Sequence, residues 1–438
     1  MFIRWGTLYD CGDEEVRLGL CQFALIKLLC ATADNIVLTE AQKYALLSHR
    51  LALDINSTTY VPLTPSEAEK EHYQVTNHMR VVTSIGDSIE SLRSVASSEP
   101  LLSEAAFLIM SDQTSFKLAD ALATVLTGFS INIGDRAELL VSAFFTWARD
   151  TTVMKCPDTR PGQLSRYFSV TELFASLFSE RTFKPMSQSR PSLSHDHATS
   201  NQQTFQTAFC DTYMHFNHVI KLEEQKVLNR SYLLALLARG AAAMGANCQP
   251  GIDAVYPYLH GGIELDFRNL GFILVQVKKN DDVDPLSRAR IFKKMDPFEC
   301  GLLHECDKVD GYLPTPLIRI VFALCGNEEK LDHMTYSSEP DGASSFSGGR
   351  PCFTSYDFWC SGASAEVLKP VKESPEKWSA LVKEPDSLKK FYATAEDPDI
   401  VRSLHPGAAS HPAHFKSWCG PIPAVEQRYP FPGAPRNV

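Results

Sequence analysis

The chain has 438 residues, of which 44% are hydrophobic and 21% carry a charge. This balance is typical of folded globular protein and excludes a chain that is disordered throughout. The formal net charge of −10 excludes a broad, non-specific polyanion binder, although it leaves room for a local basic groove. The length allows two to three domains, each with its own core.

The cysteines and the N-terminus indicate the compartment. The twelve cysteines are scattered without a Cys-x-x-Cys pair, which fits a reducing environment and gives no zinc pattern. The first residues run quickly into acidic positions, unlike a secretory signal, and the apolar stretch 18–29 is too short to span a bilayer. We therefore expect a cytoplasmic or nuclear protein that is not secreted and does not act on a membrane.

Residues 1–150 predict a helical domain. Apolar residues recur at three- and four-residue spacing, which is typical of amphipathic helices, in the segments 14–30, 38–53, 100–110, 115–127 and 136–148. Thr39 and Ser103 each precede a glutamate and are expected to cap helices. Nothing in this region predicts catalysis, so we interpret it as a packing or interaction domain.

The segment 151–204 is expected to connect this helical domain to the next one. Its last part, 186–203, is polar and low in complexity and predicts a linker. At the other end of the chain, 331–438 predicts a loop-rich C-terminal extension, because Pro, Gly and Ser are frequent there.

The segment 205–330 predicts an α/β core. A helix is expected over 205–244, and a turn-rich break follows at 245–251. Further expected elements, in chain order, are strands at 252–259, 263–267 and 271–278, a helix at 285–295 and a strand at 317–324. This order of helix, three strands, helix and strand places the chain in the α+β or α/β class, as a multidomain protein.

Aromatic residues follow a helical spacing at the start of this core. They are Phe205, Phe209, Tyr213 and Phe216. A stripe of this kind is more often core packing than a base-stacking surface. We expect His215 and His218 beside it to be structural as well.

The apolar strand 271–278 carries the candidate functional residues. Alternate residues of a strand share a face, so Gln276 and Lys278 end a face that begins with apolar side chains. The opposite face is wholly apolar and should pack on a helix. Two polar groups at the end of a buried strand need partners, and Asp253 at the start of an earlier strand supplies one.

Together these residues predict a metal site for phosphodiester cleavage. A carboxylate from Asp253, the amide oxygen of Gln276 and the carbonyl of Val277 are oxygen ligands of the kind that Mg²⁺ (or Mn²⁺) accepts. Lys278 would orient or help to deprotonate a water, while the metal would stabilise charge on the phosphate.

The Asp253, Gln276 and Lys278 pattern resembles the PD-(D/E)xK, restriction-endonuclease-like nucleases, in the Gln-x-Lys form of Mrr-like restriction enzymes. The residues at 238–253, 276–280, 295–298 and 318–324 look closer still to nuclease domains of the Crinkler and retrotransposon-hot-spot type in uncharacterised fungal proteins. The resemblance covers about 120 residues and implies a restriction-endonuclease-like core and a nucleic-acid substrate. Relatives often carry a phosphate-binding loop upstream, but no Gly-x-x-x-x-Gly-Lys-(Ser/Thr) occurs here, so ATP-driven action is not expected.

The resemblance also implies a metal-binding glutamate on the preceding helix. Glu223 and Glu224 are the candidates, with a slight preference for Glu224, while Glu264 and Asp266 are weaker alternatives. Gln276 stands where an acidic residue is usual, which removes one negative charge from the site. That departure keeps a second hypothesis open, in which the chain is a catalytically inactive nuclease-fold protein that acts as an interaction or nucleic-acid-binding module.

A basic cluster follows the strand. Its members are Lys279, Arg288, Arg290, Lys293 and Lys294. These side chains either contact the phosphates of a nucleic acid or form a solvated helix face paired with Asp281, Asp282 and Asp284. Because the chain as a whole is acidic, a protein partner for substrate delivery is compatible with this pattern.

Overall fold

The structure is a computed structural model. It describes residues 14–31, 37–53, 65–84, 93–112, 116–127, 133–155, 167–194, 203–222, 224–246, 251–278, 284–303, 315–326, 328–336 and 353–383. Helices and a mixed sheet combine within these ranges, so the fold belongs to the α+β class. None of the helices in these ranges is long and apolar enough to cross a membrane.

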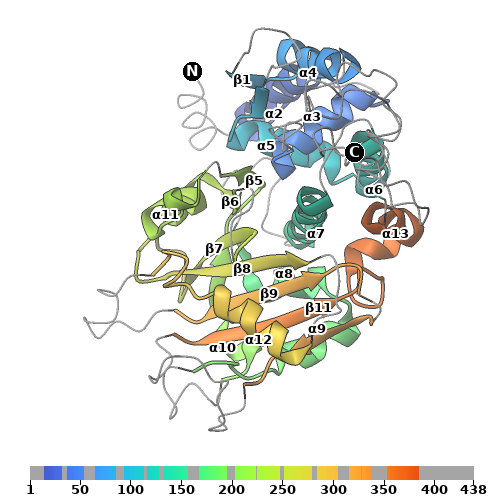
Figure 1. The fold of residues 1–438 in the computed structure, drawn as a ribbon. Coiled ribbons are helices and arrows are strands. Elements are labelled where there is room, and N and C mark those ends of the chain that lie inside the picture. Colours follow the sequence, from blue (N-terminus) through green and yellow to red (C-terminus); the bar gives the residue numbers. More distant parts are fainter. Residues whose placement is uncertain are drawn as a thin grey trace, which may run out of the picture.

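The N-terminal part is helical, with one small hairpin (Figure 1). Its helices are α2 (Glu14–Leu29), α3 (Glu40–Leu51), α4 (Pro65–Asn77), α5 (Pro100–Met110), α6 (Leu118–Thr127) and α7 (Ile133–Lys155), and its hairpin joins β1 (Arg80–Ser84) to β2 (Arg93–Ala96). The five helices expected from the spacing of apolar residues are confirmed. The sequence did not predict α4 and the hairpin, and α7 continues past the expected domain boundary at 150.

One of the two predicted caps is confirmed. The Thr39 hydroxyl accepts a hydrogen bond from the backbone N–H of Gln42, whose side chain in turn accepts one from the N–H of Thr39. Ser103 is not a cap, because α5 already begins at Pro100, whose fixed φ suits the first helical position. The Ser103 hydroxyl instead donates to the carbonyl of Glu99, one turn earlier.

The second part of the chain is built on one mixed sheet. Its strands are β3 (Phe168–Ser169), β4 (Thr212–Met214), β5 (His218–Lys221), β6 (Ala241–Met244), β7 (Ala254–His260), β8 (Leu270–Lys278), β9 (Leu317–Ala323), β10 (Lys330–His333) and β11 (Ser355–Ser361). The order along the sheet is β10-β11-β9-β8-β7-β4-β3, and β6 pairs with both β7 and β5. Strand β8 runs antiparallel to β7 and parallel to β9.

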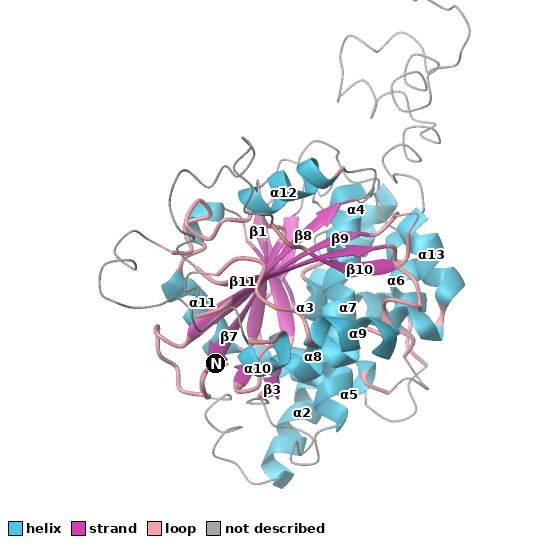
Figure 2. Ribbon diagram, turned by 90° about the horizontal axis from the view of Figure 1, so that it is seen from below, coloured by secondary structure: helices cyan, strands magenta, loops and turns pink. Residues whose placement is uncertain are grey.

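Helices cover both faces of this sheet (Figure 2). They are α7, α8 (Val170–Leu177), α9 (Glu180–Ser187), α10 (Phe205–Ala208), α11 (Arg230–Arg239) and α12 (Pro285–Lys294), with short 3₁₀ turns η3 (Gln225–Val227) and η5 (Lys369–Glu373). Helix α13 (Pro375–Lys383) packs on α6 instead. The two faces of β8 belong to different cores. Ile273 and Val275 pack in the large core shared with the N-terminal helices, and Phe272 and Leu274 pack in a smaller core.

The predicted facing of β8 is therefore confirmed, and α7 is a helix on its wholly apolar face (Figure 1). The aromatic stripe is also core, since Phe205, Phe209 and Phe216 are buried, although Tyr213 is half-buried. These aromatic residues do not share one helix, because they lie on α10, on β4 and in the turns that follow.

Two predicted elements of the core are wrong. The expected helix 205–244 is divided into α10, β4, β5, η3, α11 and β6. Its strands are too short to show an alternation of apolar and polar residues, and the all-apolar sequence of β6 is equally compatible with the end of a helix. The expected strand 263–267 is an exposed turn between β7 and β8, so the three strands in sequence order are β6, β7 and β8.

The regions expected to be linker and loop contribute to the sheet. Residues 186–194 of the predicted linker end α9 and pass along β11, where Leu193 bridges to Ser355. The predicted loop-rich extension supplies β11, which pairs with β9 over seven residues. Residues 195–202 and 384–438 lie outside the described residues.

Candidate active site at the end of strand β8

Several strands end at one edge of the sheet. Strand β5 is parallel to β6, and β8 is parallel to β9, so all four carboxyl ends lie there. Strand β7 is antiparallel to β6 and to β8, so its amino end, preceded by Asp253, lies at the same edge. The topology therefore brings Asp253 beside the final residues of β8, Gln276 and Lys278.

Asp253 is held directly against the end of β8. Its Oδ2 accepts hydrogen bonds from Nε2 of Gln276 and from the backbone N–H of Val277, both at 2.5 Å. Its backbone N–H donates to the carbonyl of Val275 at 2.8 Å, and its carbonyl accepts from Gly245 at 2.7 Å. The structure thus brings together two of the three predicted catalytic residues in direct contact.

A glycine fixes the turn that leads into Asp253. Gly251 has a φ of +93°, a conformation that side chains other than glycine rarely adopt. A Cβ added there would lie 2.3 Å from the backbone oxygen of Lys294 at the end of α12. The close approach of Gly251 to α12 therefore depends on glycine, and it sets where the next residues enter β7.

Electrostatics distinguish Asp253 from an ordinary surface aspartate. Burial raises the pKa of its carboxyl, and the Val277 N–H, the charge of Lys278 and Gln276 offset that rise only in part. Lys278 is half-buried, and the charge of its ammonium acts on this carboxylate. The site therefore combines a partly desolvated carboxylate, a buried amide and an amine.

The additional acidic candidates lie in different places. Glu224 follows β5 at the same edge as Asp253, but its exposed side chain pairs with Lys226. Glu264 and Asp266 follow the carboxyl end of β7, so the length of that strand, on the order of 20 Å, separates them from Asp253. These two alternatives are excluded from the site, and Glu223 lies outside the described residues.

The donor atoms fit one cation held by few protein ligands. Among the described residues no three His, Cys, Asp or Glu side chains form a metal-binding group. Asp253 Oδ1 accepts no hydrogen bond from the described residues, and the amide of Gln276 carries an oxygen as well as the nitrogen that faces Asp253. Mg²⁺ commonly binds through one or two carboxylates and retains several waters, so this donor set suits it.

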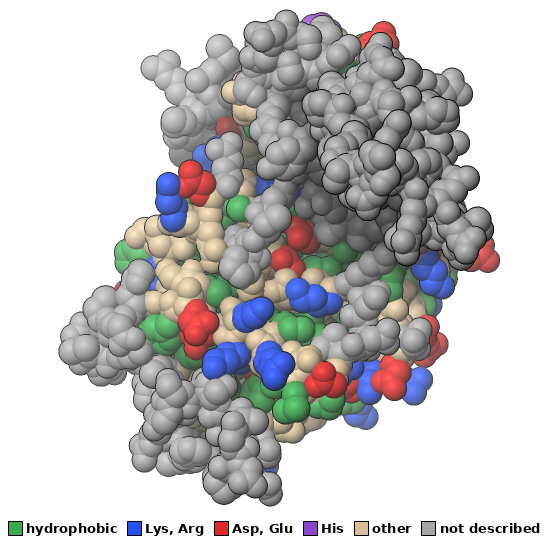
Figure 3. Space-filling model, in the orientation of Figure 1, with side chains coloured by type: hydrophobic (Ala, Val, Ile, Leu, Met, Phe, Trp, Pro, Cys, Tyr) green, Lys and Arg blue, Asp and Glu red, His purple; other side chains and the backbone are tan. Residues whose placement is uncertain are grey.

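The predicted basic residues divide into two groups. Arg288 faces inward, where it pairs with Asp332 at 3.1 Å and lies 4.6 Å over the ring of Trp359. Arg290 and Lys294 are exposed on α12, and Figure 3 shows Lys and Arg side chains gathered over this part of the surface. Lys293 is half-buried on the same helix, and Lys279 lies outside the described residues.

Of the three acidic residues expected to pair with this basic face, the structure describes Asp284, which has another role. Asp284 caps α12, and its carboxylate accepts hydrogen bonds from the backbone of Leu286 and Ser287. Asp281 and Asp282 lie outside the described residues. Arg290 and Lys294 consequently have no ion pair with any described residue.

One contact at the site has no signal in the sequence. The backbone N–H of Val277 donates to Asp253, and any residue except proline supplies such a group. Only the register of β7 against β8, which pairs Ala254 with Val275, makes this donor identifiable.

A serine, a histidine and an asparagine also meet away from this edge. Ser98 Oγ lies 2.8 Å from Nε2 of His218, whose Nδ1 lies 2.6 Å from Oδ1 of Asn217. Burial, together with the charges of Arg239 and Arg50, lowers the pKa of His218 to about 3. So weak a base would not activate a serine at neutral pH, so we assign no catalytic role to this group.

The arrangement has been compared with known proteins at three levels. No family model, no curated protein and no solved structure matched the chain.

Proposed function

We propose that the chain is a metal-dependent nuclease that hydrolyses nucleic-acid phosphodiester bonds at the end of β8. The observation that carries the proposal is the carboxylate of Asp253, which is partly desolvated and pairs with no arginine of the described residues. It lies against Gln276 and close to Lys278. Perturbed carboxylates of this kind, beside a polar amide and an amine, are typical of catalytic sites.

Each residue has a distinct role in this proposal. Asp253 Oδ1 and the amide oxygen of Gln276 would hold a single Mg²⁺ or Mn²⁺, while the N–H of Val277 fixes the carboxylate through Oδ2. The bound metal would act as a Lewis acid toward the phosphate. Lys278 would position a water for attack and balance charge near the phosphate, because its amine is near enough for its charge to act on Asp253.

The substrate would reach this edge of the sheet along α12. Gly251 packs against the carbonyl of Lys294, so the end of α12 lies next to the turn that leads to Asp253. Arg290 and Lys294 are exposed on that helix and pair with no acidic side chain of the described residues, and cationic side chains in such positions contact phosphates without regard to base sequence.

The test is cleavage of single- and double-stranded DNA and RNA by the full chain with Mg²⁺ or Mn²⁺. Asp253→Ala and Lys278→Ala should each lower the rate by about 100-fold or more, because each removes a group that acts at the phosphate. Asp266→Ala and Lys184→Ala are matched controls, since both residues lie away from the site, and their rates should remain unchanged. Cleavage that survives both site variants would overturn the proposal.

The second candidate is a nuclease-fold module that binds nucleic acid or protein without cleaving. The observation in its favour is that Asp253 is the only acidic side chain in contact with Gln276 among the described residues. A folded wild type that binds no Mn²⁺ and cleaves none of the four substrates would establish this candidate instead.

A further inference from the structure

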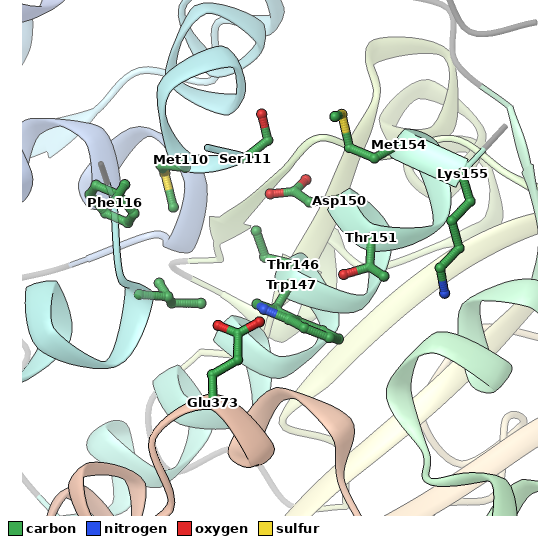
Figure 4. A pocket seen from close by; sticks show the side chains of 11 residues that line it. Met110, Ser111, Phe116, Thr146, Trp147, Asp150, Thr151, Met154, Lys155 and Glu373 are labelled. Atoms are coloured by element: carbon green, nitrogen blue, oxygen red, sulfur yellow. The ribbon is translucent and has the colours of Figure 1, made fainter. Parts of the chain in front are cut away.

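A cavity of about 310 Å³ lies between α7, the end of α5 and η5. Buried Met110, Phe116, Thr146 and Asp150 line its inner part, and Glu373 lies at its mouth. Figure 4 shows the Glu373 carboxylate beside the indole of Trp147. The volume is at the lower end of the range found for small-molecule sites.

Two polar atoms on the cavity wall have no hydrogen-bond partner among the described residues. Thr146 is only 1% exposed, and its Oγ1 makes no hydrogen bond in the described structure. Asp150 accepts through Oδ1 from Arg50 at 2.7 Å and from Arg149 at 3.0 Å, while no described residue donates to its Oδ2, and the side chain is 12% exposed. A buried hydroxyl is rarely left unpaired in proteins, so Thr146 Oγ1 indicates a molecule that hydrogen-bonds to it, and Asp150 Oδ2 offers that molecule a second acceptor.

The charges around these two atoms are balanced. Arg50 and Arg149 are compensated by Asp150 and by Glu104, whose Oε2 lies 3.7 Å from Arg149. Lys155 and Glu373, which also line the cavity, carry opposite charges as well, so these surroundings offer no net charge to attract a cationic or anionic ligand. The carboxylate Oδ2 can only accept a hydrogen bond, so the ligand must present a donor.

We propose that this cavity binds a small, uncharged, planar molecule that carries an amino group. The amino group donates to Asp150 Oδ2 and to Thr146 Oγ1. The planar body packs against Trp147 and Phe116, which supply aromatic surface on the cavity wall. Amino-substituted heterocycles have this combination of shape, neutrality and N–H donors.

Asp150 itself is unsuitable for a test by substitution. Its two arginine partners also hold the chain that enters β5, since Arg50 donates to the carbonyl of Asn217 at 2.5 Å and Arg149 to that of Phe216 at 2.9 Å. Removing the carboxylate would leave two buried guanidinium groups without their partner and would disturb the fold.

The experiment is a titration of the full chain with four probes, in which binding is measured by isothermal titration calorimetry and by tryptophan fluorescence. Adenine and purine have the same ring system and differ in the amino group, while benzylamine and benzoate test a cation and an anion. We expect adenine to bind at least about fivefold more tightly than purine, because purine has no amino group to donate to Asp150 Oδ2 and to the buried Thr146 Oγ1. Benzylamine and benzoate should bind more weakly than adenine.

Thr146→Val removes one acceptor and keeps the shape of the side chain, so it tests the site without opening a void. It should lower the affinity for adenine by about fivefold and leave the affinity for purine unchanged. Thr76→Val on α4 is the control, because its hydroxyl bonds within its own helix, and it should bind both probes as the wild type does. Absence of adenine binding, equal affinity for adenine and purine, or an unchanged Thr146→Val would each overturn the proposal.

Discussion

Two aspartates of the same sheet, Asp357 on β11 and Asp253 before β7, have opposite surroundings. Asp357 is completely buried, and both its oxygens accept from Arg319, at 2.8 and 2.6 Å. Tyr336 adds a third hydrogen bond at 2.8 Å. Asp253 pairs with no arginine in the described part of the chain and uses one oxygen for a neutral amide and a backbone N–H.

The difference separates a structural carboxylate from one that is available for chemistry. Arg319 and Asp357 pair directly across β9 and β11, and although burial alone would lower the pKa of Arg319, Asp357 raises it above the ordinary value. For Asp253, burial prevails over its partners and raises the pKa of the carboxyl. A fully paired ion stabilises the sheet, whereas Asp253 retains an oxygen for another ligand.

The largest change in the free energy of unfolding is expected from substitution of the paired aspartate, Asp357. Asp357→Asn should lower the free energy of unfolding by about 3–5 kcal/mol, because it leaves the Arg319 guanidinium buried without a counter-charge. Urea unfolding followed by circular dichroism would measure the loss. A change below about 1 kcal/mol would mean that water reaches Arg319 and that Asp357 is not the structural member of the comparison.

A smaller loss of stability is expected at the glycine that positions Asp253. Gly251→Ala should lower the free energy of unfolding by about 2–3 kcal/mol, because it combines a φ of +93° with a Cβ only 2.3 Å from a backbone oxygen. The same variant should reduce any activity that depends on Asp253 by moving the turn before it. Gly261→Ala is the control, since its φ is also positive but its Cβ would meet nothing within 4 Å. Equal losses in the two variants would contradict a specific role for the contact with α12.

The smallest effect has the opposite sign. Asp253→Asn should raise the free energy of unfolding at neutral pH by about 1 kcal/mol, because it removes a partly desolvated charge. A carboxyl whose pKa is raised in the folded state contributes stability below its ordinary value of 3.8, and that contribution is lost as pH rises through the folded-state pKa.

The advantage of Asp253→Asn should therefore vanish in acid and grow toward neutral pH. Unfolding of both proteins across that pH window would measure the trend. An advantage that grew in acid instead would mean that the folded state stabilises the carboxyl of Asp253 in its ionised form.

The sequence predicted the long and periodic elements well. The apolar strand ending in Gln276 and Lys278 is present as β8, and its two faces enter two different cores. The contact of Asp253 with Gln276 was also predictable, because a carboxylate and a buried amide each need a partner. The position of Lys278 near both follows from the same strand.

The short strands and the pairings between distant segments could not be predicted. Strands β4, β5 and β6 contain three or four residues each, so neither alternation nor helical period is visible in them. Asp357 lies 38 residues beyond Arg319, and no local pattern indicates that β11 returns to pair with β9. Glu264 and Asp266 were misplaced for a related reason, because a turn with alternating residues was interpreted as a strand.

Binding of Mn²⁺ to the full chain, measured by electron paramagnetic resonance at neutral pH, tests the central claim that Asp253 is the carboxylate available to a cation. Wild type should bind one ion, and Asp253→Asn should lose it, while Asp266→Asn should retain it because Asp266 lies at the other end of β7. Binding that is equal in wild type and Asp253→Asn, or that is absent from the folded wild type, would contradict the account.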